Sequence, residues 1–389
     1  MLFGIVTAMC KNETSLEFYI VDKIKDIPEA EWDRLFGAGL IEGYGYHQTL
    51  QESHLKEFSF YYLLARRNNT LVAIIPFFTT DFSFTTIIQG SLQKFITAIQ
   101  NKFSRFLKMK ILFVGNPTCE EFYLGIAQGE DLNMILEGAL KELSRFCKRE
   151  KIGTLLFYNL TAAYTLMARY LAKKGFSIMA SFPNTMLEIR SDSLESYINS
   201  LSKSTRKGLR RKLRDSAQAV ELKTEVRDDI SDVQGRIYEL YRNNLIDGEI
   251  YFEILTPEFF RDICHNTKGT TKFFLTYAKD KIVAFSLVLI KGEHMIEKFV
   301  GFDAEVSHRY NLYYTTFVHN IDYCIKNGLR FYQMGITDYE PKVRLGSRLI
   351  PLYVYVRFLS PLRNLFSGLL VKILEPKRFD PTLKNIKYY

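Results

Sequence analysis

The chain has 389 residues, of which 47% are hydrophobic and 24% charged, so it can bury an ordinary core and is neither disordered nor fibrous. This length is typical of two domains. The net charge of +9 indicates an anionic partner, such as a phosphate-bearing substrate, a nucleic acid or a lipid surface.

The chain shows no sign of export or of a membrane span. Residues 1–10 are apolar but have no basic residue before them and no small-residue cleavage site, and no apolar run reaches about 18 residues. The five cysteines lie far apart, without a Cys-x-x-Cys motif or a nearby histidine pair, so we expect neither a disulfide framework nor a metal site. We therefore expect a cytoplasmic protein.

The first clear element is a hairpin over residues 61–75, which reads as an apolar strand, an Asn-rich turn and a second apolar strand. Residues 273–285 repeat this plan. Each hairpin is followed at a distance by a helix, a glycine and another apolar strand. The sequence therefore predicts one α/β unit that is present twice.

An insertion at about 81–115 distinguishes the first copy. Its segment 92–107 has apolar residues at three- and four-residue spacing, while its other face carries basic residues and no acid. This pattern is typical of a helix lying in a lipid interface, although a core-packing helix has the same spacing.

The first copy ends with a helix over residues 134–151, Gly153 and a strand over 154–158. We expect Gly153 to take the left-handed conformation that often ends a helix. Capping residues at 191–193 then precede a new apolar-periodic run, which places the boundary between the copies near residue 190.

A basic helix opens the second copy, since residues 203–214 hold seven basic residues and no acid. Arg206, Arg210 and Arg214 recur at four-residue spacing and so share one face. That face could bind a donor phosphate, the backbone of tRNA or lipid headgroups, or it could simply be solvated.

The strand predicted over residues 295–302 is apolar except for Glu297 and Lys298. An unpaired carboxylate in such a strand is costly to bury and has a raised pKa, which suits a general base. The alternative is an outward-facing Glu297 paired with a neighbouring lysine. A helix over 312–326, Gly328 and a strand over 329–333 complete the second copy.

A polar loop follows Gly335 and contains Asp338, Glu340, Lys342 and Arg344. Sites in α/β proteins commonly lie beyond strand ends. Glu340 is therefore a second candidate base, and the two cations could hold a phosphate or carboxylate. An ordinary polar loop is the alternative.

The last segment, 359–389, is predicted to be an amphipathic basic tail with a helix over residues 361–374. Together with residues 92–107, this helix favours peripheral contact with a membrane surface, on the inner face of the cell membrane.

The run 201–214 resembles the opening of the catalytic half in the double-domain GNAT-like N-acyltransferases, a group that includes the Fem-type peptidoglycan aminoacyltransferases. Residues 301–303, 312–314, 328–332 and 335–346 are similar as well. With the duplicated hairpin, the resemblance covers roughly residues 55–358.

The resemblance implies an α/β fold of two tandem GNAT-like modules with mixed sheets and helices on both sheet faces. The modules would span residues 17–190 and 191–358, and the second would carry the donor site. Its central strand, 295–302, would part from its neighbour and hold the donor's pantetheine arm and thioester. The helix that begins near Asn311 would present its N-terminus to the pyrophosphate.

The resemblance also implies roles in acyl transfer. Glu297 or Glu340 would be the base, and Asp338 is a further catalytic candidate. Tyr313 or Tyr314 would donate to the oxyanion or to the leaving thiolate, although adjacent aromatics are also typical of a core. The residues expected to bind the donor are Arg206, Arg210, Arg309, Asn311, Lys342 and Arg344.

The sequence departs from ordinary GNAT enzymes where their glycine-rich pyrophosphate loop would lie, because residues 308–311 read His-Arg-Tyr-Asn. No permanently bound cofactor is expected. Acyl-CoA, an acyl carrier protein and aminoacyl-tRNA all stay open as donors.

The leading hypothesis is an N-acyltransferase that moves an acyl group from a thioester donor to an amine of an amphipathic or lipid-like acceptor at a membrane. One alternative is a Fem-type transferase that uses aminoacyl-tRNA and a peptidoglycan precursor. Another is a non-catalytic lipid- or nucleic-acid-binding protein on a decayed acyltransferase scaffold, although no known nucleic-acid-binding motif is present.

Overall fold

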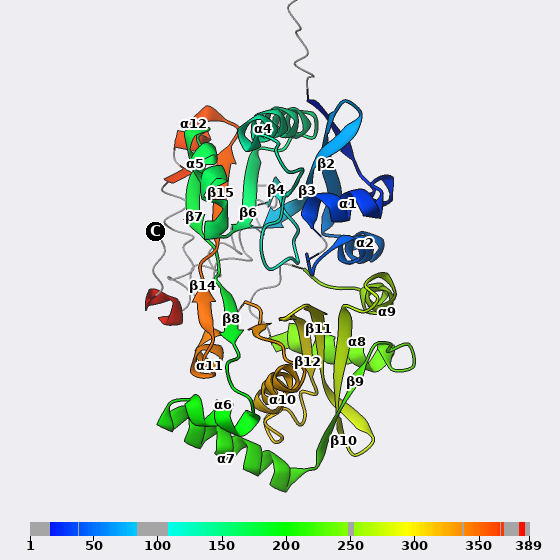
Figure 1. Cartoon of the computed structure of the whole chain (residues 1–389), viewed down its shortest axis with the longest axis vertical. Helices are drawn as coiled ribbons and strands as arrows, with labels where there is room; N and C mark the ends of the chain where they lie inside the picture. Colours follow the sequence, from blue (N-terminus) through cyan, green and yellow to red (C-terminus); the bar gives the residue numbers. More distant parts are fainter. Residues whose placement is uncertain are drawn as a thin grey trace, which may run out of the picture.

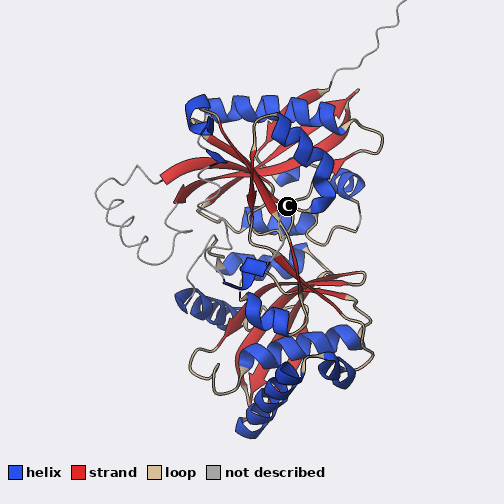
Figure 2. Cartoon of the chain, turned by 90° about the vertical axis from the view of Figure 1, so that its left-hand side faces the viewer, coloured by secondary structure: helices blue, strands red, loops and turns tan. Residues whose placement is uncertain are grey.

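Two mixed β-sheets lie one above the other along the long axis of the molecule (Figure 1). The computed structural model describes residues 16–37, 39–83, 108–247, 253–336, 338–365, 367–368 and 381–385. Figure 2 shows both sheets nearly edge-on, with helices on either side. The predicted α/β fold with two modules is confirmed.

The first sheet has the strand order β1-β2-β3-β4-β6-β15-β7, with the two-residue strand β5 (Gly125–Ile126) added to β3. Its strands are β1 (Glu17–Val21), β2 (Phe58–Arg67), β3 (Thr70–Ser83), β4 (Lys108–Val114), β6 (Thr154–Leu160), β15 (Tyr353–Phe358) and β7 (Ser177–Ala180). The helices packed around it are α1 (Glu29–Phe36), α2 (Tyr44–Glu52), α4 (Leu132–Arg149), α5 (Thr165–Lys173) and α12 (Pro361–Leu365), with short 3-10 helices at Ile24–Asp26 and Ala162–Tyr164.

The second sheet has the order β14-β8-β13-β12-β11-β10-β9. Its strands are β14 (Arg348–Ile350), β8 (Asn184–Glu188), β13 (Phe331–Gln333), β12 (His294–Phe302), β11 (Lys281–Lys291), β10 (Thr271–Ala278) and β9 (Leu222–Arg227). Its helices are α6 (Leu194–Ser200), α7 (Lys203–Ala219), α8 (Gln234–Asp247), α9 (Pro257–Asn266), α10 (Leu312–Lys326) and α11 (Tyr339–Arg344), and a further 3-10 helix spans Pro381–Asn385.

The internal duplication extends over both sheets. The two predicted hairpins are β2–β3 and β10–β11, and Ala73 and Ala284 occupy the same ladder position, opposite Ala65 and Thr276. The two strand orders correspond position by position. The first sheet reads β1-β2-β3-β4-β6-β15-β7, and the second, taken from its other edge, reads β9-β10-β11-β12-β13-β8-β14. The hairpins therefore have equivalent surroundings.

Each sheet is completed by a strand from the other half of the chain. β8 follows β7 in sequence but pairs with β13 and β14, while β15 follows β14 but pairs with β6 and β7. Both exchanged strands lie on the far side of the sheet from the hairpin. The exchange crosses the module boundary predicted at residue 190, because β8 precedes that boundary and belongs to the second sheet. It likewise places β15, at the end of the predicted second module, in the first sheet.

The modules also share a core. Side chains of α2, including Tyr46 and Leu50, are fully buried in one hydrophobic cluster with Phe259 and Ile263 of α9. Gly45 permits this close approach, since a Cβ atom at that position would lie 1.9 Å from the carbonyl oxygen of Asn266. The two sheets are thus parts of one packed body.

Two local predictions need correction. The predicted insertion at 81–115 includes β4, which is the equivalent of β12 and so belongs to the repeated unit. The apolar end of that segment is a core strand and not additional sequence. Gly153 does not take a left-handed conformation, because Lys151 does so at φ 56°, whereas Gly328 has the expected positive φ of 68°.

The two segments that are predicted to contact a membrane are described only in part. Residues 92–107 lie outside the described residues, as do 366 and 369–374 of the predicted helix 361–374. α12 is described, and its Leu362 and Leu365 are 71% and 78% exposed. Among the helices that are described, none is long and apolar enough to cross a membrane.

Candidate active site

The parallel ladder between β12 and β13 ends early. Its last pair joins Ile296 to Gln333, whereas the equivalent ladder of β4 and β6 continues to Val114 and Phe157. Glu297 is thus the first residue of β12 beyond the ladder. The two strands part at this carboxylate, as the resemblance implied.

The Glu297 side chain points toward α10 and is almost wholly buried, with the residue 4% exposed. Its Oε1 accepts hydrogen bonds from Asn320 Nδ2 at 2.8 Å and from Ser286 Oγ. Asn320 Nδ2 also lies 2.9 Å from Tyr332 Oη. Glu297 is therefore not the outward-facing carboxylate of the alternative interpretation, and four polar side chains form one buried cluster.

Burial raises the pKa of Glu297 to about 7, against the opposing effects of the Ser286 hydrogen bond and the charge of Lys342. A carboxyl group with this pKa exchanges protons near neutral pH. The local environment therefore suits a general base.

The duplication shows what the same positions hold in the first module. Leu112 pairs with Leu155 as Met295 pairs with Tyr332, and the buried faces of α4 and α10 align when Cys147 is set against Cys324. On this alignment, the counterparts of Ser286, Glu297, Asn320 and Tyr332 are Ile75, Val114, Leu143 and Leu155.

All four counterparts in the first module are apolar, and none is more than 2% exposed. The first module therefore folds with apolar side chains at these positions. Burying four polar side chains instead costs free energy unless every group is satisfied. The shared fold does not require the polar cluster around Glu297, which makes this cluster the candidate site.

Lys342 is buried beside this cluster. Its Nζ donates to the carbonyl oxygens of Gly335 and Ile336 at 3.4 and 3.3 Å. Burial lowers the pKa of Lys342, and the negative charges of Glu297, Asp338 and Glu120 oppose that effect. Lys342 is thus a buried amine inside the site and is not exposed to solvent.

Of the two adjacent tyrosines, Tyr313 is the one directed toward the acidic groups. Its hydroxyl is buried and has no hydrogen-bond partner among the described residues. Burial raises the pKa of Tyr313, and the charges of Asp338 and Glu297 raise it further. Tyr314 instead packs under Lys212, whose Nζ lies 4.3 Å from the ring centroid. Tyr313 is therefore the better candidate for a proton donor.

We predict that Tyr313→Phe lowers kcat by about 10²-fold, the lower end of the usual effect of removing a positioned proton donor. Because the hydroxyl makes no hydrogen bond within the described part of the chain, the same change should leave Tm unchanged or raise it. Initial rates and thermal denaturation test both statements, with Tyr314→Phe as the matched control. An unaltered rate for Tyr313→Phe would exclude this role.

Glu340 and Arg344 face solvent on α11. Their side chains are 64% and 66% exposed and form an ion pair of 2.6 Å with each other. The structure therefore does not bring Glu340 to the Glu297 cluster, although both are candidate bases from sequence. Only Lys342 and Asp338 of this loop contribute charge there.

Arg206 and Arg210 fasten α7 to α6. Arg206 donates to the carbonyl oxygens of Asn199 and Leu201 at 2.8 and 3.2 Å, and Arg210 bonds to Glu195 and to Asn199 Oδ1. Their predicted role as donor ligands competes with these internal bonds. The cations of α7 that make no such internal bonds lie at neighbouring positions of the helix.

Asn311 and Arg309 lie in the turn before α10. Asn311 has a left-handed backbone at φ 49°, and its Nδ2 donates to the carbonyl oxygen of Lys212 at 3.3 Å. The guanidinium of exposed Arg309 lies 5.7 Å from the ring centroid of Tyr310. Asn311 thus connects the turn to α7, and the contact of Arg309 stays within the turn.

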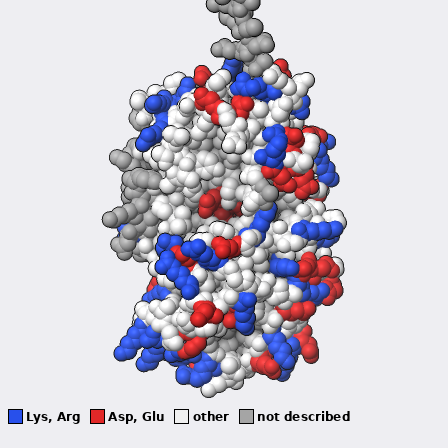
Figure 3. Space-filling model, in the orientation of Figure 1, with Lys and Arg blue, Asp and Glu red and all other residues white. Residues whose placement is uncertain are grey.

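Sequence reasoning missed a buried ion cluster between the modules. Lys298 points away from α10, and its Nζ lies 2.6 Å from Glu42 Oε1 and 3.0 Å from Glu120 Oε1. It also donates to the carbonyl oxygen of Thr118 and lies 5.2 Å from the ring centroid of Tyr46. Figure 3 shows acidic side chains within a mostly uncharged hollow where the modules meet.

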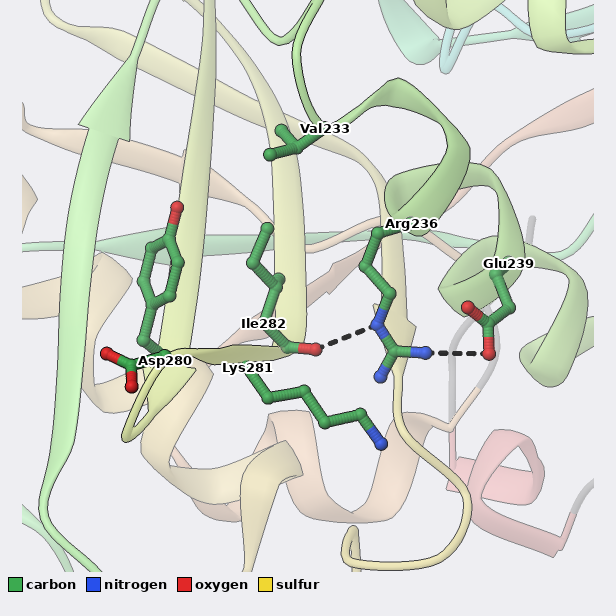
Figure 4. A pocket seen from close by; sticks show the side chains of 7 residues that line it. Val233, Arg236, Glu239, Asp280, Lys281 and Ile282 are labelled. Atoms are coloured by element: carbon green, nitrogen blue, oxygen red, sulfur yellow. Dashed lines mark hydrogen bonds and ion pairs between the residues drawn. The ribbon is translucent and has the colours of Figure 1, made fainter.

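A separate open pocket of about 450 Å³ lies between α8 and the β10–β11 turn (Figure 4). Arg236 in it donates to the carbonyl oxygen of Ile282 at 3.0 Å and pairs with Glu239 at 2.7 Å. A further ion pair joins Arg236 to Asp303. Since its charges are neutralised internally, this pocket offers no catalytic set.

Residues 203–343 match the sequence model of a family described as an acetyltransferase (GNAT) domain. The matched range contains β12, the parting of β12 from β13, and the Glu297 cluster. This part of the chain is therefore a GNAT-like domain. The resemblance proposed from sequence is thereby confirmed.

Solved structures show the same fold over most of the GNAT-like chain. The crystal structure of FemX has a TM-score of 0.55 and 11% identity, and covers 90% of this chain and 99% of its own. A tandem GNAT protein from the clavulanic acid biosynthesis pathway has a TM-score of 0.53 and 11% identity, with 89% and 99% covered. Two tandem modules are therefore the shared architecture.

A curated relative is also similar in sequence. It is described as a putative 8-amino-7-oxononanoate synthase 2 of Mycobacterium tuberculosis and is 23% identical over 329 residues. The match covers 81% of this chain but 42% of the relative, so the chain spans less than half the length of the curated proteins it matches.

Proposed function

We propose that the protein is an N-acyltransferase that moves an acyl group from a thioester to an amine. The observation that carries this proposal is the Glu297 cluster, which lies where β12 parts from β13 and has only apolar counterparts in the first module. The donor is acyl-CoA or an acyl carrier protein, used as a co-substrate and not held permanently.

In the proposed reaction, the amine nitrogen forms a bond to the thioester carbonyl carbon while Glu297 receives a proton of the amine. Because Glu297 is 4% exposed, the proton passes through an intervening water. The C–S bond then breaks, and Tyr313 gives its proton to the thiolate. The proton held by Glu297 restores Tyr313 through solvent, so the products are an amide and a thiol.

The start of α10 does not fit a pyrophosphate in the manner of a glycine-rich loop. The backbone N–H of Leu312 donates to Ser307, and those of Tyr314 and Thr315 donate to Asn311. The amides that would bind a diphosphate are thus largely used within the turn. No step of the proposed mechanism therefore depends on binding of the nucleotide part of coenzyme A.

We also propose that the acceptor is amphipathic and is met at the inner face of the cell membrane. The exposed leucines of α12 and the apolar and basic pattern of residues 92–107 support this placement. The Fem-type alternative, with aminoacyl-tRNA and a peptidoglycan precursor, draws support from the basic surface of α7.

The test is acyl transfer from labelled acyl-CoA and acyl carrier protein, with short and long chains, to a panel of amines that includes lipid-like ones. We expect amide formation from at least one thioester donor, and a rate about 10²- to 10⁴-fold lower with Glu297→Gln. Transfer from aminoacyl-tRNA alone would favour the Fem-type alternative. Failure with every donor would reject the proposal.

A further inference from the structure

One face of α7 presents a row of cations to solvent. Lys203, Lys207 and Arg211 are exposed, and no acidic side chain lies within ion-pair distance of them among the described residues. Arg214 continues the row and lies 3.8 Å from Asp215. These four residues, the α7 stripe, extend about 16 Å along the helix.

The helix that carries the α7 stripe packs against α10. Lys212 joins the two helices, since its carbonyl oxygen accepts from Asn311 and its ammonium lies over Tyr314 at 4.3 Å. Figure 3 shows basic side chains at the end of the molecule where Figure 1 places α6 and α7. The unpaired positive charge is thus on a helix that contacts the start of α10, where the amides are already used.

The composition of this surface restricts its partner. The nearest leucine, Leu209, is 2% exposed, and the large exposed apolar residues of the described chain do not include any on α6 or α7, so the stripe has no anchor for a lipid interior. Glu195 and Asp215 border it with side chains 67% and 50% exposed. A row one helix wide between acids fits an acidic protein helix better than a nucleic-acid backbone, which needs a broader basic field.

We infer that the α7 stripe is the docking surface for an acidic acyl carrier protein that delivers the thioester on its phosphopantetheine arm. This inference rests on the proposed function and names its donor. Attraction between the stripe and acidic side chains of the carrier supplies the contact energy that a nucleotide would otherwise give.

The stripe is tested with the triple variant Lys203→Glu, Lys207→Glu, Arg211→Glu and the control Lys141→Glu, Lys148→Glu, Lys173→Glu, whose lysines are also exposed. The probe is holo acyl carrier protein with a fluorophore on its pantetheine thiol. We expect the stripe variant to weaken binding by about 10- to 100-fold at low salt, because like charges then meet. The control should bind as the wild type does, and both variants should keep the wild-type circular dichroism spectrum.

Activity separates this inference from the proposed function. The stripe variant should lose kcat/KM with acyl carrier protein but keep it with an acyl-pantetheine donor, which has no protein surface. Equal binding of the carrier by stripe and control variants would overturn the inference, as would stripe-dependent binding of tRNA or of anionic vesicles in its place. Carrier binding without transfer from any donor would reject the proposed function and leave the docking surface standing.

Discussion

Replacing Glu297 by glutamine is expected to lower kcat by about 10²- to 10⁴-fold, the range for loss of a general base. Glutamine has the size of glutamate and can still accept hydrogen bonds from Ser286 and Asn320, so the fold should persist. Thermal denaturation of the variant checks this point. Glu340→Gln is the matched control, because Glu340 is exposed and should leave the rate unaltered.

The pH dependence gives a second reading of the same role. Since the pKa of Glu297 is about 7, the base is protonated and inactive below this pH, and wild-type kcat/KM should rise as pH increases through about 7. The acceptor amine also titrates, but at higher pH. The rise of kcat/KM near pH 7 should therefore be absent in Glu297→Gln, while the rise caused by titration of the amine stays. Persistence of both rises in the variant would show that another group is the base.

A non-catalytic scaffold makes the opposite prediction. In that case Glu297→Gln would remove the free-energy cost of burying the carboxyl group. The variant would then keep cellular function and be as stable as the wild type or more stable. Loss of function with retained stability separates the enzyme from the decayed scaffold.

The repeated hairpins could be found from sequence because a hairpin is a local structure with a local pattern. The exchange of β8 and β15 could not, since pairing partners are set by contacts far apart in sequence. The sequence pattern places β4 in the predicted insertion for a related reason. Its apolar residues continue the periodic pattern of the segment before it.

Within the site, Glu297 was visible from sequence because a carboxylate interrupts an apolar strand. Ser286, Asn320 and Tyr332 were missed, since a lone polar residue in a buried element has no signature of its own. A residue-by-residue alignment of the two copies would have exposed all four positions at once. The predicted arginine face of α7 differs by about one residue from the face that points to solvent. The sequence does not show which face of α7 packs on α6.

Lys298→Met is expected to destabilise the protein by about 3–5 kcal/mol, the cost of removing one partner from a buried ion cluster. Burial alone would lower the pKa of Lys298, but the charges of Glu120 and Glu42 outweigh it and hold the pKa raised. Without the ammonium, Glu42 is left 0% exposed with no cation beside it. Urea denaturation measures the loss, and Lys291→Met on the neighbouring strand serves as a partly exposed control.

The second variant Lys298→Met, Glu42→Gln separates charge from packing. If the buried carboxylate causes the loss, neutralising it should restore a substantial part of the stability, giving a coupling within the range found for contacting residues. Lys298 also follows Glu297 on β12, beyond the last pair with β13, so its bonds to Glu42, Glu120 and Thr118 hold that free edge against the first module. We therefore expect the double variant to regain stability but not the full rate, because the strand that carries the base is no longer fastened. If the double variant regained both stability and rate, Lys298 would have only a structural role. If Lys298→Met were as stable as the wild type, the buried ion cluster would not exist as described.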